Sequence, residues 1–196
     1  MRTCIFCLGL ALGMWLAAPQ LCAQQGDNQD TAAQTARKDK KKAAKPKQGK
    51  AAKAISRLRT LNRVKPSGKA AYYIILQSAS WCGGCNAEMP HVVSAYEEMK
   101  KEGLVELVLA SADYDPVSAK GFVDKYNGKF PVVMAKDAKK IPNFKPARGI
   151  PWAMVLDADG NEVENNNGAI IVPKWKQYEE KARQEREAAA AAETEE

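Results

Sequence analysis

The chain has 196 residues, a length that allows one ordinary domain with appended segments. Its formal net charge of +7 is spread unevenly: residues 24–71 hold 14 basic and 3 acidic side chains, whereas residues 72–172 hold 10 and 13. The basic character therefore belongs to an N-terminal arm. Because this arm has no aromatic side chains that could stack on bases, the sequence argues against nucleic-acid binding.

Residues 1–23 have the pattern of a secretory signal peptide. Arg2 supplies the positive charge, residues 5–18 are apolar, and Ala23 is a small residue after which a signal peptidase could cleave. The apolar run is short for a membrane span. We therefore expect an exported protein, either periplasmic or secreted. Two alternatives would tether it to the membrane: an uncleaved leader, or a lipid on Cys22.

The cysteines point to one site. Three of the five, Cys4, Cys7 and Cys22, lie in the leader, so cleavage would leave only Cys82 and Cys85. A single C-x-x-C pair in an exported protein cannot build a framework of disulfides. Its sulfur is available for thiol–disulfide exchange or for one local bridge.

Residues 24–53 are predicted to form a flexible, basic, low-complexity linker. The stretch 37–53 holds nine basic residues against one acid, and it has too few apolar side chains to fold alone. For an exported chain, the partner that this composition allows is an anionic surface of the cell envelope, contacted weakly.

The rest of the chain alternates between helix and strand patterns. A short amphipathic helix is expected at 55–64. Expected strands, recognised by their apolar and β-branched runs, lie at 72–77, 105–110, 130–135, 152–156 and 169–172. Expected helices lie at 86–101, 117–126 and 175–192, the last continuing as an Ala/Glu-rich helical tail over 179–196. This order predicts an α/β fold in which a mixed central sheet carries helices on both faces.

The C-x-x-C pair lies where the strand at 72–77 is followed by the helix at 86–101. Cys82 is therefore near a helix N-terminus, where unpaired backbone N–H groups and the positive end of the helix dipole favour a thiolate. Two residues between the cysteines let the thiols close a small ring, and glycine at both positions tolerates the tight turn. The pattern indicates a redox centre. We expect no metal, because a zinc site would need further ligands and the one histidine is His91.

Trp81-Cys82-Gly83-Gly84-Cys85, with Pro90 five residues later, resembles the active-site motif of thioredoxin. The residues flanking this motif are more similar to those of exported or membrane-anchored thioredoxin-like thiol-disulfide oxidoreductases. The resemblance runs from about residue 71 to residue 178. It implies a three-layer thioredoxin-like fold, within a domain that we place at 54–178.

A second site residue follows from the same resemblance. Pro151 stands where thioredoxin-like proteins place a cis-proline beside the C-x-x-C pair, and a trans proline that opens a strand is the alternative. The resemblance implies that the backbone of Ile150 pairs with an extended substrate segment, while Trp81 and Pro151 flank the reactive sulfur.

The chain departs from thioredoxin at the buried acid six residues before the first cysteine, where it has Leu76. The lysine that often pairs with this acid is replaced by an apolar residue, which we place at Leu109. The usual route for a proton at the second cysteine is therefore absent. Glu88, one helical turn beyond Cys85, is our candidate for a proton relay, and an ordinary exposed helix acid is the alternative.

The sequence thus predicts an exported thiol-disulfide oxidoreductase without a cofactor. Cys82 attacks and Cys85 resolves, in exchange with protein thiols or disulfides and with a separate redox partner. Two alternatives are a redox-silent module that binds partners through Ile150 and Pro151, and a Cu(I) carrier that uses the two thiolates. The pattern leaves open whether the protein is a reductase, an oxidase or an isomerase.

Overall fold

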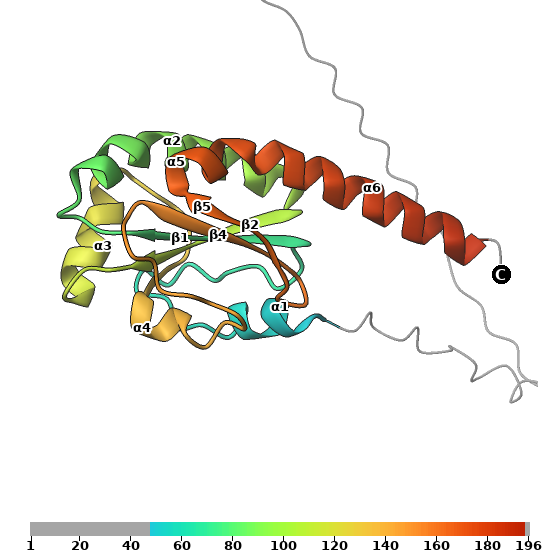
Figure 1. Ribbon diagram of the computed structural model, residues 1–196, viewed down its shortest axis with the longest axis horizontal. Coiled ribbons are helices and arrows are strands. Elements are labelled where there is room, and N and C mark those ends of the chain that lie inside the picture. The colour runs from blue at the N-terminus through green and yellow to red at the C-terminus, as the bar shows by residue number, and fades with distance from the viewer. Residues whose placement is uncertain (1–47, 195–196) are drawn as a thin grey trace, which may run out of the picture. The chain divides into compact units, whose positions relative to one another are not determined.

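The computed structural model describes residues 48–194 of the chain (Figure 1). The predicted leader at 1–23, the alternative lipid site at Cys22 and most of the predicted linker lie outside the described residues. The last two residues of the predicted tail do so as well.

Five strands form one mixed sheet in the order β3-β2-β1-β4-β5. β1 (Tyr72–Ser78) pairs in parallel with β2 (Val105–Ser111), which pairs in parallel with β3 (Val132–Met134). β4 (Trp152–Asp157) runs antiparallel to β1 and to β5 (Glu162–Asn167). Because β1 and β2 are parallel, they end at the same edge of the sheet, which we call the carboxyl edge. The loops that follow the two strands meet there.

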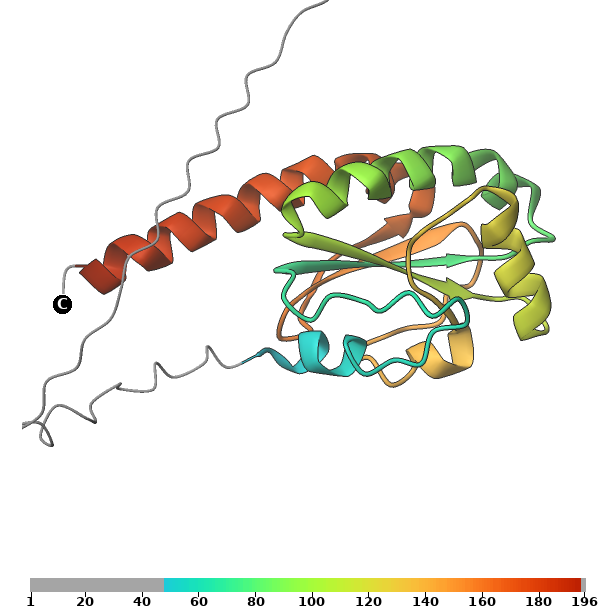
Figure 2. The same cartoon turned by 180° about the vertical axis from the view of Figure 1, so that it is seen from behind.

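Helices cover both faces of this sheet (Figure 1 and Figure 2). One face carries α2 (Gly83–Glu102), α3 (Pro116–Lys125), α5 (Gly168–Ile171), the 3₁₀ turn η1 (Val172–Lys174) and α6 (Trp175–Thr194). The other face carries the two short helices α1 (Lys50–Ile55) and α4 (Ala135–Ala138).

The central strand β1 divides the core into two clusters. All of its residues are buried, and its side chains alternate between the faces: Tyr72, Ile74 and Leu76 pack under α2, whereas Tyr73 and Ile75 pack towards α1 and α4. A strand buried on both faces has a continuous apolar sequence, which is the signal that predicted it. The three layers confirm the predicted α/β, thioredoxin-like fold with a mixed sheet and helices on both faces.

The prediction for the start of the domain was wrong in detail. The first helix spans Lys50–Ile55 and not 55–64, and Arg63 adopts a left-handed conformation with φ 60° that no helix accommodates. Residues that we assigned to the linker belong to the folded unit: Ala51 and Ala52 are buried, and the Ala52 N–H donates to the Ala158 carbonyl at 3.0 Å. Small alanines fit against the β4–β5 turn, but within a Lys/Ala-rich stretch they give no apolar signal.

The strand predicted at 169–172 was also wrong. The second strand of the hairpin is the polar β5, and the β-branched stretch after it forms α5 and η1. The Asn167 side chain accepts a hydrogen bond from the Ala169 N–H at 2.8 Å, which starts the helix. Ile171 of α5 and Val172 of η1 are both buried in the core cluster under α2. Tertiary packing here overrides the strand preference of branched side chains.

The final helix α6 agrees with the prediction but packs further along its length than expected. Its buried residues include Tyr178, Glu179 and Ala182, and the Tyr72 hydroxyl donates to Glu185 at 2.7 Å. The domain therefore continues past residue 178 as far as Glu185, and residues 186–194 are an exposed helical extension. Within residues 48–194, no helix has the length and apolar character needed to cross a membrane.

Candidate redox site

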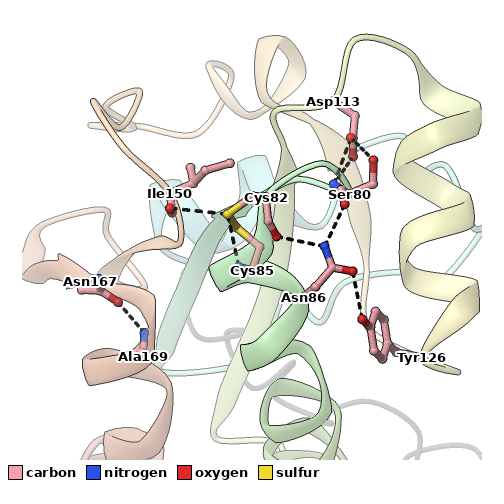
Figure 3. The surroundings of a disulfide bond; sticks show 9 residues. All are labelled: Ser80, Cys82, Cys85, Asn86, Asp113, Tyr126, Ile150, Asn167 and Ala169. Atoms are coloured by element: carbon pink, nitrogen blue, oxygen red, sulfur yellow. Dashed lines mark hydrogen bonds between the residues drawn. A yellow bond between two sulfur atoms is a disulfide. The ribbon is translucent and has the colours of Figure 1, made fainter.

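The two cysteines form a disulfide at the start of α2, with their Cα atoms 5.2 Å apart (Figure 3). Their exposures differ sharply. Cys85 lies in the first turn of the helix and is 1% exposed, packed in the cluster under α2. Cys82 is partly exposed, and the neighbouring Trp81 is 59% exposed. A macromolecule approaching this edge can therefore reach only one of the two sulfur atoms.

Cys82 is the N-cap residue of α2. Its Sγ accepts a hydrogen bond from the Cys85 N–H at 3.2 Å. The helix begins with two glycines and has no acidic residue in its first turn that would compete for this positive end. A thiolate on Cys82 would therefore be stabilised by a backbone donor and by the helix dipole, as the sequence predicted.

Ile150 and Pro151 lie on the other side of the disulfide. Their peptide bond is cis, as predicted, and the Ile150 carbonyl oxygen lies 3.6 Å from Cys82 Sγ. The pairing of β4 with its neighbours begins only at Trp152. The Ile150 backbone thus stands outside the sheet ladder, directly beside the exposed sulfur.

Gly168 fixes the position of this proline loop. Its N–H donates to the Pro151 carbonyl at 3.1 Å. A Cβ atom on Gly168 would lie 2.8 Å from Leu76 Cδ1 and 3.3 Å from Pro151 Cβ, so no larger residue fits without a shift of its neighbours. The α5 start, the proline loop and the end of β1 are therefore in direct contact.

The apolar replacements seen in the sequence lie in the core as expected. Leu76 of β1 pairs with Leu109 of β2, and both side chains are buried in the same cluster as Cys85. Glu88 is half-buried on α2 and lines an open pocket of about 470 Å³ together with the exposed His91 and Lys176. Of the hydrogen bonds formed by residues 48–194, none joins Glu88 to either cysteine.

Asn86 is a residue of the site that the sequence did not reveal. Its side-chain amide donates to the Ser80 carbonyl at 2.8 Å and to the Cys82 carbonyl at 2.9 Å. Its oxygen accepts a hydrogen bond from the Tyr126 hydroxyl at 2.9 Å, just beyond the end of α3. One side chain thus joins the loop before α2 to a second helix (Figure 3).

Asp113 is the second residue that the sequence did not reveal. It lies in the loop after β2, is 6% exposed, and accepts hydrogen bonds from Ser80 and Ser111. In the sequence it formed part of an ordinary turn, Asp-Tyr-Asp-Pro. The available signal was topological: a carboxylate that directly follows a strand parallel to β1 must lie at the same edge as the cysteines.

Between Gln48 and Thr194, no group of three or more His, Cys, Asp or Glu side chains is placed so that it could hold a metal ion.

The chain is similar to known proteins in sequence and in structure. The sequence profile of the Redoxin family matches residues 47–181. The thiol-disulfide oxidoreductase ResA of Bacillus cereus is 35% identical over 85 residues, which are 43% of this chain and 48% of that protein. ResA of Halalkalibacterium halodurans is 30% identical over 91 residues, 46% and 51% of the two chains. The chain thus spans about half the length of the curated relatives that it matches.

Among solved structures, a thiol-disulfide oxidoreductase from Bacteroides fragilis superposes with a TM-score of 0.49 at 19% identity. The superposition covers 61% of this chain and 93% of that one.

Proposed function

The chain belongs to the Redoxin family, and on this premise we propose that it is a thiol-disulfide oxidoreductase that exchanges its Cys82–Cys85 pair with protein thiols and disulfides. The match to the ResA oxidoreductases supports this activity. The observation that carries the proposal is the asymmetry of the pair. One sulfur is exposed at a helix N-terminus, whereas the other is buried directly behind it.

In the reducing direction, the Cys82 thiolate attacks one sulfur of a substrate disulfide. A new S–S bond forms, the substrate S–S bond breaks, and one substrate sulfur leaves as a thiolate that takes up a proton. Cys85 then loses its proton and attacks Cys82 Sγ. The second substrate thiol is released, and the two electrons given to the substrate leave the Cys82–Cys85 pair oxidised. The same steps in reverse would oxidise a dithiol.

Three further residues have proposed roles in these steps. Ile150 has its backbone outside the sheet ladder, so an extended substrate segment can pair with it, and the exposed Trp81 beside Cys82 can contact the same substrate. Glu88 is the proposed proton acceptor for Cys85, because no acid occupies the position of Leu76 and Glu88 lies one turn further along α2. We also propose export, on the leader pattern of residues 1–23.

Mixed-disulfide trapping tests whether Cys82 attacks the substrate and Cys85 resolves the mixed disulfide. In Cys85→Ser, Cys82 can attack but the product cannot be resolved, so covalent adducts with a disulfide-bearing protein such as insulin should accumulate. Cys82→Ser should trap none, because the remaining sulfur is buried. Adducts are counted by non-reducing electrophoresis, with the native protein as the control. Equal trapping by both variants would show that the roles are wrongly assigned.

The direction of electron flow follows from one further measurement, the reduction potential of the Cys82–Cys85 pair against a glutathione buffer. A potential as low as that of thioredoxin, about −270 mV, would make the protein a reductase, and one near −120 mV would make it an oxidant.

A further inference from the structure

We propose that Asp113 is a positioning residue for residues 79–82, the loop between β1 and α2, which we call the redox loop. Its carboxylate holds Ser80 so that Cys82 remains at the N-terminus of α2. This inference rests on the proposed oxidoreductase function, which it deepens by adding a residue from outside the C-x-x-C motif. A network of hydrogen bonds surrounds the loop between β1 and α2 (Figure 3).

The first part of this network lies between Asp113 and Ser80. The carboxylate accepts from the Ser80 N–H at 3.0 Å and from the Ser80 hydroxyl at 2.6 Å. The carboxylate is itself oriented by Ser111, whose hydroxyl donates to it at 2.8 Å and accepts from the Asp113 N–H at 3.0 Å. The last residue of β2 therefore fixes the carboxylate, and the carboxylate fixes the loop that leaves β1.

The second part links Ser80 to the reactive cysteine. The Cys82 N–H donates to the Ala79 carbonyl at 3.3 Å, which makes a tight turn of residues 79–82. On its far side, this turn is held by Asn86, whose amide reaches the carbonyls of both Ser80 and Cys82. Hydrogen bonds thus connect the turn to β2 through Asp113 and to α2 and the end of α3 through Asn86. Removal of either set of hydrogen bonds should let Cys82 Sγ move away from the Cys85 N–H.

A neighbouring carboxylate shows that Asp113 is not an ordinary helix cap. Asp115 is exposed and accepts hydrogen bonds from Val117 and Ser118, all within the first turn of α3. Asp113 lies two residues earlier in the same loop, yet its partner Ser80 is 33 residues away along the chain. Burial of a carboxylate carries a cost in free energy that is offset only when donors surround it. Here two of those donors come from the redox loop.

The test compares three variants of the full chain: Asp113→Ala, Asp113→Asn and, as the matched control, Asp115→Ala. The first readout is the rate of alkylation at Cys82 as a function of pH, followed by mass spectrometry of the Cys82 peptide after reduction. The second readout is the rate of disulfide exchange with insulin. Both are measured well below the melting temperature of each variant, so that a loss of stability alone does not change them.

Asp113→Ala should move the alkylation midpoint upward, towards the ~8.5 of a free cysteine. It should also slow exchange about tenfold, because a displaced nucleophile loses the aligned geometry of attack. Asp113→Asn keeps a carbonyl oxygen for the Ser80 N–H and should restore most of both values. Asp115→Ala should melt at a lower temperature, because α3 loses its cap. Its alkylation midpoint should equal that of the native protein.

A native midpoint and exchange rate in Asp113→Ala would overturn the proposal, as would an equal shift of the midpoint in Asp115→Ala. If Asp113→Ala does not fold, Ser80→Ala takes its place. It removes only the hydroxyl contact and should shift the midpoint in the same direction by less, whereas no shift would again overturn the proposal. If the native protein exchanges no disulfides, the proposed function fails, but the alkylation midpoints still decide whether Asp113 positions Cys82.

Discussion

A buried carboxylate lies near each end of strand β2, and the two carboxylates hold different segments of the chain. Asp113 follows the strand at its carboxyl end and Glu106 lies near its beginning, and each is 6% exposed. Asp113 accepts from the N–H of Ser80, in the loop that leaves β1. Glu106 accepts from the N–H of Ser67 at 2.6 Å, in the segment that enters β1. Two buried carboxylates beside β2 therefore hold the chain on either side of the central strand.

The difference lies in what each carboxylate holds. Glu106 also accepts from the Leu107 N–H at 3.1 Å, and burial raises its pKa above the ordinary value of 4.5 despite these donors. The segment that it holds carries no reactive group. We infer that Glu106 contributes to stability alone, whereas Asp113 acts on the reactivity of Cys82.

The largest expected effect in this comparison is that of Glu106→Ala. The substitution leaves the Ser67 N–H without its acceptor and opens a cavity, so the free energy of unfolding should fall by about 2–4 kcal/mol. Urea denaturation measures this loss. The alkylation midpoint of Cys82 should not move, and a shift as large as that of Asp113→Ala would remove the distinction between the two ends.

The second largest effect is expected for Gly168→Ala, which alters the carboxyl edge of the sheet without removing a charged group. The new Cβ would contact Leu76 and Pro151 and push the proline loop away from the disulfide. We expect a loss of about 1–3 kcal/mol in the free energy of unfolding, together with slower exchange. Gly149→Ala is the control, because a Cβ there meets no atom within 4 Å. Similar losses in both variants would mean that the contact with Pro151 is unimportant.

The pH dependence of stability gives a smaller and more specific signal. Because the pKa of Glu106 is raised in the folded protein, the native state binds more protons than the unfolded state above pH 4.5. This contribution to stability is fully present below that pH and is lost as the pH rises through the folded pKa. The loss is about 1.4 kcal/mol for each pH unit that separates the folded pKa from the unfolded one. Glu106→Gln should flatten the part of the profile above pH 4.5. A native profile in the variant would show that another group is responsible.

Arg183→Ala should have the smallest effect. The guanidinium of Arg183 binds the Glu102 carboxylate at 2.9 and 3.0 Å and joins α6 to the end of α2, but both side chains are nearly half exposed. Exposed ion pairs contribute at most about 1 kcal/mol, so the melting temperature should fall by no more than a few degrees. A loss that matched that of Glu106→Ala would show that this pair anchors α6 more strongly than its exposure indicates.

The parts of the fold that could be predicted are those where local sequence and tertiary environment agree. β1 and β2 are buried on both faces and consist mostly of apolar residues, and the start of α2 is marked by the C-x-x-C pair. The stretch 169–172 was misassigned because its branched residues favour a strand. Its helical form depends on the Asn167 cap and on the close approach of Gly168 to Leu76, and neither is visible in a local pattern.

In the candidate site as well, some residues could be predicted from the local sequence and others could not. Cys82, Cys85 and Pro151 were predicted because a short motif and one proline carry the resemblance to thioredoxin. Asp113 and Asn86 were missed because their partners Ser80 and Tyr126 lie 33 and 40 residues away, and only the folded chain brings them together. Sequence spacing can locate reacting sulfur atoms, but it does not show which polar groups hold them in place.

The exposed end of α6 has a consequence for how the protein can be attached to something else. Glu185 of this helix accepts a hydrogen bond from Tyr72, the first residue of β1, and it therefore lies at the end of the strand opposite Cys82. Residues 186–194 continue as a straight helix into solvent (Figure 2). At about 1.5 Å per residue, these turns reach about 13 Å beyond the domain. A fluorophore, a fusion partner or a solid support joined at residue 194 would stand on a stiff spacer that points away from the disulfide, and it would leave the approach of a large protein to Cys82 unobstructed.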